Sequence, residues 1–397
     1  MLEKPVRLFA PIDFRTRFPA LDGIRALAIV AVFADHYGGG SHGGKILVLL
    51  NRARSFGWLG VDLFFVLSGF LITGILFDTL GDSKYFRRFF ARRSLRIFPV
   101  YYLVFAVLLI LTPYAGYVWK PGHLLFLAYL GNFLGNYNFD YYAIQATHHP
   151  MMVAGISHFW SLCVEEQFYL LWPLVVFSLR KRRSLMTAGV ALCSLALVLR
   201  IAMYHYGGPE LAERWIVRTL PFRMDSLIMG GLLALLLRGS HADAVQRSCK
   251  WLLLGGSAIA ASILLLTPYN SFLVLTFNST FVAIACVGLI GTTLRVNGPA
   301  FQLFNLKPLR TLGKYSYGFY IFHLIFRWEW IAFLVYLGTK LHSLALAGIA
   351  ALSVNFAVTF LAAKISYDFF ESRFLRYKKH FEYDSEVESH RHAFVTE

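Results

Sequence analysis

The sequence predicts an all-α protein that crosses a membrane about ten times. Of its 397 residues, 57% are hydrophobic and only 15% are charged, with a mean hydropathy of +0.56. Apolar runs of roughly 20 residues follow one another, and this is the length that an α-helix needs to cross the hydrocarbon core. Lys and Arg gather in the short loops between these runs, which is typical of the cytoplasmic loops of membrane proteins.

The basic loops set the direction of the chain. Because Lys and Arg are retained on the cytoplasmic side, clusters such as Lys84–Arg96 and Arg180–Arg183 indicate cytoplasmic loops. Both termini are expected on that side, and the first run lacks the features of a cleavable signal peptide. The spans predicted by this pattern are 20–38, 57–79, 98–118, 158–179, 184–204, 215–237, 251–268, 272–294, 315–337 and 343–366.

One apolar segment, residues 123–134, is too short to cross. It is expected to re-enter the membrane or to lie on its outer surface, with 136–157 as an external loop. The chain then divides into a cytoplasmic segment at 1–19, a membrane domain at 20–377 and a flexible cytoplasmic tail at 378–397.

The net charge of +16 would suggest nucleic-acid binding in a soluble protein. Here the topology of a membrane protein accounts for most of it, so no nucleic acid is expected as a partner. The remaining charge could attract anionic lipid headgroups or a phosphorylated substrate. The four cysteines form no CxxC pair, and His123, His148 and His149 lack paired spacing, so no metal site is predicted.

Arg25 and His36 lie in the first apolar run, eleven residues apart. At ~100° per residue they point within ~20° of one another, about 16 Å apart along the axis. A charge in a membrane helix is costly and usually marks a cavity or a functional site. An Arg that can hold an anion, in line with a His that can move a proton, predicts group-transfer chemistry. Asp35, next to His36, is a further cavity candidate.

Three acidic residues could share that cavity. Asp62 is expected near the outer end of the second span, level with His36, although it could also be an interfacial residue. Glu165 and Glu166 are adjacent in an otherwise apolar run and are hard to explain by packing. Since neighbours differ by ~100° around a helix, we expect at most one of the two to face a cavity shared with His36, while the other could bind a second helix. A carboxylate there would orient the imidazole as a general base.

Basic and mixed-charge segments give the remaining candidates. Arg92 and Arg96 are four residues apart and could clamp the phosphates of a nucleotide-like donor, with Arg93 beside them, or they could be simple topological charge. Arg223 and Asp225 cannot face one direction, so each is expected to meet a partner from another span, for a structural or a functional reason. His323 could be a buried packing residue or a second cavity imidazole.

Six segments in this order resemble the acyltransferase 3 family of integral membrane O-acyltransferases, which modify cell-surface glycans. They read LDGIRALAIVAVFADH, GVDLFFVLSGFLI, FFARRSLRIFPVYY, HFWSLCVEEQFYLLWP, PFRMDSLIMGGLLA and LGKYSYGFYIFHLIF, and Tyr367–Ser372 resembles the motif that closes the membrane part. No P-loop, GxGxxG or hydrolase elbow competes with this resemblance.

The resemblance implies roles for these residues. His36 would be the general base, and Arg25 would hold the donor or stabilise charge. Glu165 matches the acidic position of a His-x-Trp-Ser-Leu-x-x-Glu motif. The coenzyme A contacts would come from Arg92 and Arg96, while Ser68 matches the Phe-Phe-x-x-Ser-Gly motif.

The resemblance also implies the reaction partners. Acetyl-CoA would be the donor, with no permanently bound cofactor, and a carbohydrate or lipid-linked glycan would be the acceptor. The location would be a bacterial inner membrane. Many relatives carry a fused hydrolase-like domain after the membrane part. This sequence ends shortly after its last predicted span, so a stand-alone form is expected here.

Two other classes fit some of these features. Intramembrane Arg, His, Asp and Glu also occur in a proton-coupled transporter or flippase. The absence of halves that resemble one another counts against that class. A polyprenyl-linked glycosyltransferase would be expected to carry a long soluble catalytic loop, which the sequence lacks.

Overall fold

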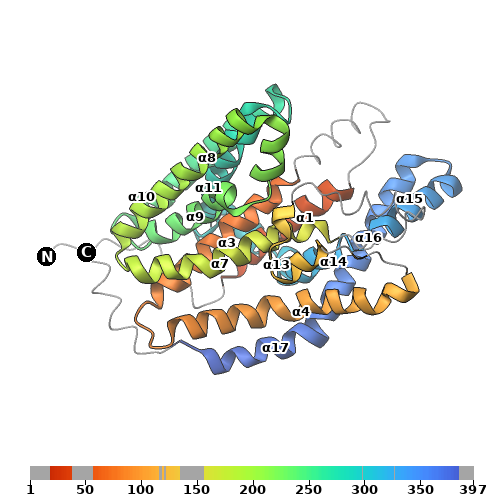
Figure 1. Cartoon of the computed structure of the whole chain (residues 1–397), viewed down its shortest axis with the longest axis horizontal. Coiled ribbons are helices and arrows are strands. Elements are labelled where there is room, and N and C mark those ends of the chain that lie inside the picture. Colours follow the sequence, from red (N-terminus) through yellow and green to blue (C-terminus); the bar gives the residue numbers. More distant parts are fainter. Residues whose placement is uncertain are drawn as a thin grey trace.

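The computed structural model describes residues 18–37, 57–115, 119, 122–134, 156–296, 298–325 and 327–383. All regular secondary structure in these residues is helical (Figure 1). The basic residues Arg7, Arg15 and Arg17 lie outside the described residues, as do His148 and His149 with most of the predicted external loop.

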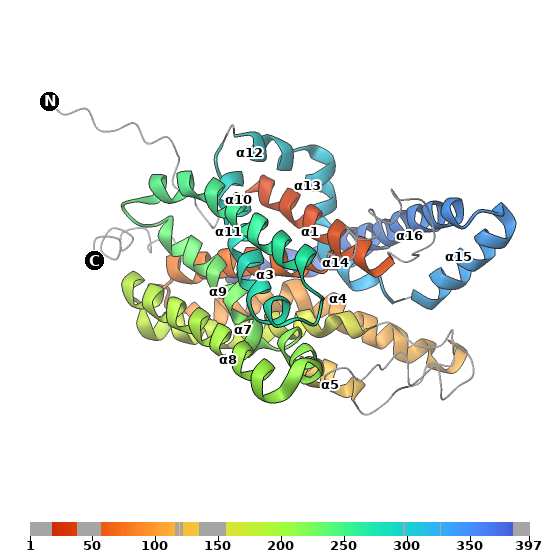
Figure 2. The ribbon, with the colours of Figure 1, turned by 90° about the horizontal axis from the view of Figure 1, so that it is seen from above.

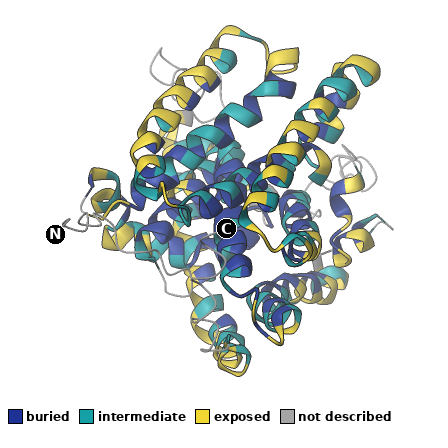
Figure 3. Ribbon diagram, turned by 90° about the vertical axis from the view of Figure 1, so that its left-hand side faces the viewer, coloured by how far each residue is buried: buried dark blue, intermediate teal, exposed yellow. Residues whose placement is uncertain are grey.

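Seven helices within the described part of the chain are long and apolar enough to cross a membrane, so the predicted class is confirmed but the count of ten is not. Peripheral helices carry exposed apolar side chains such as Ile110, Leu266 and Ile349, which suits contact with lipid (Figure 3). The seven are built on α3 Leu59–Asp78, α4 Tyr85–Ala115, α7 Trp160–Leu179, α8 Arg182–Ile216, α10 Ala242–Leu266, α11 Ser279–Thr293 with the preceding η3 Val274–Asn278, and α16 Leu344–Ser366.

Three predicted spans are absent from those seven. α1 Pro19–Tyr37 carries three charged residues within 19 positions, and α9 Leu220–Leu236 has only 17 residues. The predicted span 315–337 is wrong as a single helix, because it divides into α14 Ser316–Phe322 and α15 Arg327–Leu341. Figure 2 shows α15 and α16 packed together and projecting from the bundle, while α14 stays inside it.

The centre of the molecule is formed by α3 and α9, which approach very closely. A Cβ on Gly69 would lie 1.7 Å from the Leu227 carbonyl oxygen, and one on Gly230 would lie 1.9 Å from the Val66 carbonyl oxygen. Only glycine allows such an approach, as in other close helix pairs in membranes. α1 packs in the same manner against two short helices, α12 Pro299–Phe304 and α13 Lys307–Lys314.

Residues 123–134 form two short helices, and neither is long enough to cross. Tyr101 of α4 donates to the Phe126 carbonyl over 2.6 Å, and Gln167 of α7 donates to the Tyr129 carbonyl over 2.8 Å. The segment is therefore held against α4 and α7. Its helices are α5 His123–Leu127 and η1 Gly131–Leu134, and the 3-10 turn η2 Ser157–Phe159 leads into α7.

The helix of α16 continues without a break through the next three elements, and this continuation lies along α4 (Figure 1). Arg92 of α4 donates to the carbonyl oxygens of Lys378 and Phe381, both over 3.3 Å. The start of the predicted flexible tail is therefore helical and attached to α4. We call this continuation of α16 the returning segment. It comprises η4 Tyr367–Glu371, α17 Ser372–Arg376 and η5 Tyr377–Phe381.

Candidate active site

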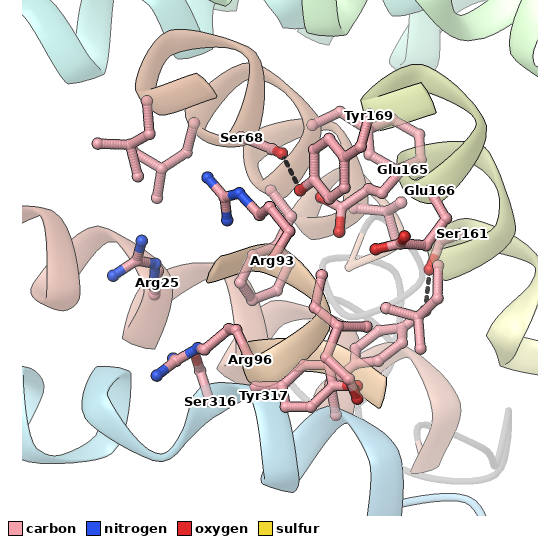
Figure 4. Close-up of a pocket in the computed structure, with 18 residues that line it drawn as sticks. Arg25, Ser68, Arg93, Arg96, Ser161, Glu165, Glu166, Tyr169, Ser316 and Tyr317 are labelled. Atoms are coloured by element: carbon pink, nitrogen blue, oxygen red, sulfur yellow. Dashed lines mark hydrogen bonds between the residues drawn. The ribbon is translucent and has the colours of Figure 1, made fainter. Parts of the chain in front are cut away.

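A cavity of about 130 Å³, here called the inner cavity, lies between α1, α3, α4, α7 and α14. Figure 4 shows arginines on one side of it and carboxylates and hydroxyls on the other. Its polar lining consists of Arg25, Ser68, Arg93, Arg96, Ser161, Glu165, Glu166, Tyr169, Ser316, Tyr317 and Tyr320.

A second cavity of about 350 Å³, here called the basic vestibule, adjoins the first. The two share Arg25, Arg93 and Arg96, so these side chains lie at the boundary between them. The vestibule is also lined by Asp22, Arg92, Lys314, Tyr367, Lys378 and Tyr383.

Local contacts hold the boundary arginines in place. Arg25 Nη1 lies 2.6 Å from Asp22 Oδ1, one turn earlier in α1. The Arg93 guanidinium lies over the Tyr169 ring, 5.1 Å from its centroid, which is a cation–π contact. The structure therefore brings three predicted cationic residues to one point, where they could hold an anion.

Glu165 and Glu166 both line the inner cavity, but His36 does not, so neither carboxylate shares this cavity with His36. The cavity covers a wide arc of α7, which also includes Ser161 and Tyr169, so residues ~100° apart both reach it. Glu165 contacts the Ser68 and Tyr169 side chains, whose oxygens are 2.5 Å apart. Glu166 Oε1 is buried and has no hydrogen-bond partner among the described residues.

His36 lines neither cavity, which corrects the expectation that it would share one with a carboxylate. Its ring lies 5.0 Å from that of His323, and His323 lies 4.8 Å from His158. We call these three residues the histidine cluster. No group of three His, Cys, Asp or Glu side chains in the described ranges is arranged to hold a metal ion.

The carbonyl partners assign the protons of two of these rings. His36 Nδ1 lies 2.8 Å from the Val32 carbonyl, and His323 Nδ1 lies 2.6 Å from the Tyr320 carbonyl. Because a carbonyl only accepts, each Nδ1 carries the hydrogen, and each neutral ring keeps its lone pair on Nε2. His323 Nε2 lies 3.4 Å from His36 Nδ1, whose hydrogen is donated to the Val32 carbonyl. His36 Nε2 is therefore available as a base.

Tyr320 and Ser161 connect the inner cavity to the histidine cluster. Both line the cavity, and their hydroxyls are hydrogen-bonded to each other. The Tyr320 hydroxyl also donates to the His158 carbonyl over 2.8 Å, and His158 Nε2 lies 3.0 Å from the Tyr320 carbonyl. Neither residue was predicted as part of the site, although helical spacing from Glu165 would have placed Ser161 on the same face of α7.

Asp62, Arg223 and Asp225 lie outside both cavities. Asp62 Oδ1 accepts from Arg223 over 2.6 Å, and Asp225 Oδ2 accepts from the fully buried Arg200 over 2.8 Å. The prediction that Arg223 and Asp225 meet partners from other helices is confirmed. The prediction that Asp62 is a cavity carboxylate near His36 is wrong. Asp62 lines neither cavity, and its carboxylate is paired with Arg223. At the end of α1, Asp35 accepts a backbone hydrogen bond from Trp58.

Comparison with known proteins decides the family. The family model described as an acyltransferase domain, of the acyltransferase 3 type, matches residues 18–364. The chain belongs to this acyltransferase family. No solved structure matches it.

Three bacterial acetyltransferases are among the curated proteins that the chain resembles. It is 29% identical to the peptidoglycan O-acetyltransferase OatA of Listeria monocytogenes, over 90% of this chain and 56% of the relative. It is 27% identical to the putative peptidoglycan O-acetyltransferase YrhL of Bacillus subtilis, over 89% of this chain and 54% of the relative. It is 27% identical to the O-acetyltransferase OatA of Staphylococcus aureus, over 77% of this chain and 50% of the relative. The chain thus spans about half the length of these relatives.

The acyltransferase match includes every residue that lines the inner cavity. It ends before three residues of the basic vestibule, namely Tyr367, Lys378 and Tyr383. The returning segment is therefore a part of the vestibule that family membership does not describe.

Proposed function

We propose that this chain is a membrane O-acetyltransferase that moves an acetyl group from acetyl-CoA to a hydroxyl of a cell-surface or lipid-linked carbohydrate. The observation that carries the proposal is the junction of the two cavities. There, Arg25, Arg93 and Arg96 stand between a basic vestibule and a cavity that contains two carboxylates. The names of the relatives support peptidoglycan as the acceptor class.

The vestibule suits the donor. Acyl-CoA carries a diphosphate and a 3′-phosphate, and guanidinium groups bind phosphates through charge-assisted hydrogen bonds. Arg92, Arg93 and Arg96 would hold these phosphates, while the pantetheine arm passes Arg25 into the inner cavity. Since these residues belong to the basic first turns of α4, the vestibule would face the cytoplasm, with both termini on that side of a bacterial inner membrane.

The transfer step would use the lone pair on His36 Nε2. His36 removes the proton of the acceptor hydroxyl as the oxygen attacks the thioester carbonyl. The new C–O bond forms, the C–S bond breaks, and coenzyme A leaves as a thiolate that takes up a proton. Ser161 and Tyr320 lie between the inner cavity and His36, so the thioester of the donor would have to pass them before the acceptor oxygen attacks. Glu165 would orient the donor arm together with Ser68.

The test is transfer of labelled acetyl from acetyl-CoA into glycan or lipid-linked material. Membranes would contain the wild-type protein, His36→Ala or the matched control His205→Ala, which changes an exposed histidine of α8. We expect label with the wild type and the control only. Label with His36→Ala would contradict the role of the base. No label with folded wild-type protein and a broad acceptor extract would contradict the donor or the acceptor and favour a transporter.

A further inference from the structure

We propose that the returning segment completes the donor site, with Lys378 as a ligand to a phosphate group of coenzyme A. This inference rests on the proposed function, because it deepens the same vestibule. Lys378 and Tyr383 line the vestibule together with Arg25, Arg92, Arg93 and Arg96. The family match ends at residue 364, before either of them.

The Arg92 side chain holds this segment against the vestibule. Arg92 Nη1 donates to the carbonyl oxygens of Lys378 and Phe381, and the Arg92 guanidinium lies 5.3 Å from the centroid of the Tyr383 ring. η5 therefore presents Lys378 to the cavity, while the next residue, Lys379, is exposed. Two adjacent lysines thus have different surroundings, and only one faces the proposed phosphates.

The charge of the vestibule indicates a multiply charged anion. Among the described residues its lining holds six basic side chains, those of Arg25, Arg92, Arg93, Arg96, Lys314 and Lys378, and one carboxylate, that of Asp22. That carboxylate already accepts a hydrogen bond from Arg25. Like charges crowded in a partly buried space repel one another unless a counter-charge binds between them. The diphosphate and 3′-phosphate of coenzyme A would supply this counter-charge.

A lipid headgroup offers the same phosphate chemistry, and two features favour coenzyme A. The vestibule adjoins the inner cavity through the shared residues Arg25, Arg93 and Arg96, so a phosphate bound at Lys378 is at the entrance of the proposed acyl path. Tyr383 and Tyr367 also line the vestibule and offer flat ring surfaces next to the phosphates, which suits a nucleotide with an aromatic base.

The experiment measures binding of labelled coenzyme A to the full chain in nanodiscs of phosphatidylcholine alone. We expect Lys378→Met to weaken binding about 10-fold, the loss expected when one charge-assisted phosphate contact is removed. Lys379→Met is the matched control and should bind as the wild type does. Lys378→Arg should restore most of the affinity. The midpoint of thermal unfolding should be equal in all four proteins.

A second arm compares acetyl-CoA with acetyl-pantetheine, which lacks phosphates. Lys378→Met should raise KM for acetyl-CoA and leave kcat and the KM for acetyl-pantetheine unchanged. Wild-type affinity in Lys378→Met would overturn the inference while leaving the proposed donor intact. An effect of Lys378→Met seen only with anionic lipid present would reassign Lys378 to a headgroup. Absence of coenzyme A binding by the wild type would overturn the proposed donor and this inference together.

Discussion

Two sets of buried charges lie on different helices, one on α3, α8 and α9 and the other on α1, α4 and α7, and they differ in how their charge is balanced. In the first set, Asp62 binds Arg223 and Asp225 binds Arg200, with N–O distances of 2.6 and 2.8 Å. We call these two pairs the ion-pair set. Each has its counter-ion within the protein.

The second set lines the cavities. Arg93, Arg96 and Glu166 line the inner cavity and form no ion pair among the described residues. Single buried oxygens without a hydrogen-bond partner occur in both sets, at Glu166 Oε1, Asp62 Oδ2 and Asp225 Oδ1, so ion pairing is what distinguishes the two. A costly charge in a membrane helix therefore indicates function only when its partner is also considered. Paired charges hold helices together, whereas charges left for a ligand form a site. Four substitutions test this difference.

The largest effect is expected for Glu165→Gln in the cavity set. It keeps the size of the side chain but removes its charge beside Ser68 and Tyr169. We expect the transfer rate to fall by at least ~10²-fold, the loss that misplacement of a bound substrate can cause, with an unchanged unfolding midpoint. The measurement is the initial rate of labelled acetyl transfer. Glu210→Gln, at an exposed position, is the control. A wild-type rate in Glu165→Gln would show that the charge of Glu165 does not serve the reaction.

The next effect concerns the ion-pair set. Asp225→Leu leaves Arg200 buried without its carboxylate, so we expect the free energy of unfolding to fall by ~3–5 kcal/mol. Adding Arg200→Met removes the stranded charge and should restore most of the stability. Thermal unfolding of both variants in nanodiscs measures this. A double variant as unstable as the single one would mean that Asp225 acts through something other than Arg200.

An intermediate effect is expected where the two sets meet. Gly69 follows the cavity residue Ser68 and packs against the Leu227 carbonyl, two residues after Asp225. Gly69→Ala forces α3 and α9 apart, at a cost of ~1–3 kcal/mol. We expect a lower unfolding midpoint and a lower transfer rate together. The control is Gly255→Ala, because a Cβ there meets nothing within 4 Å. A change in only one of the two readouts would show that the sets are independent.

Much of the fold could be predicted because apolar length and basic loops are local signals. The division of 315–337 could not, since the turn at His323–Ile325 has the same apolar composition as the helices around it. Helical periodicity correctly gave Asp225 and Arg223 separate partners. It could not identify Arg200, which comes from a different helix and is fully buried.

The site shows the same limit. Several family motifs converge on the inner cavity, as the resemblance implies, with Arg25, Arg93 and Glu165 all in its lining. Arg25 and His36 point in the same direction along α1, but only Arg25 lines the inner cavity. Ser161 and Tyr320 occupy the space between, and this depends on how α7 and α14 pack. Pattern gives the direction of a side chain, while packing decides what that side chain meets.

The smallest effect is expected for Ser68→Ala, which tests whether the cavity set is organised by hydrogen bonds as the ion-pair set is by charge. The substitution removes the 2.5 Å contact with the Tyr169 hydroxyl, a hydrogen bond worth ~0.5–1.5 kcal/mol. Tyr169 in turn supports the Arg93 guanidinium. We expect a loss of a few-fold in transfer rate, with a small rise in KM for acetyl-CoA. Ser68→Thr, which keeps the hydroxyl, should retain more activity than Ser68→Ala. Equal activities in the two variants would show that the side chain acts by its size, so that Arg93 and Glu165 are held by packing alone.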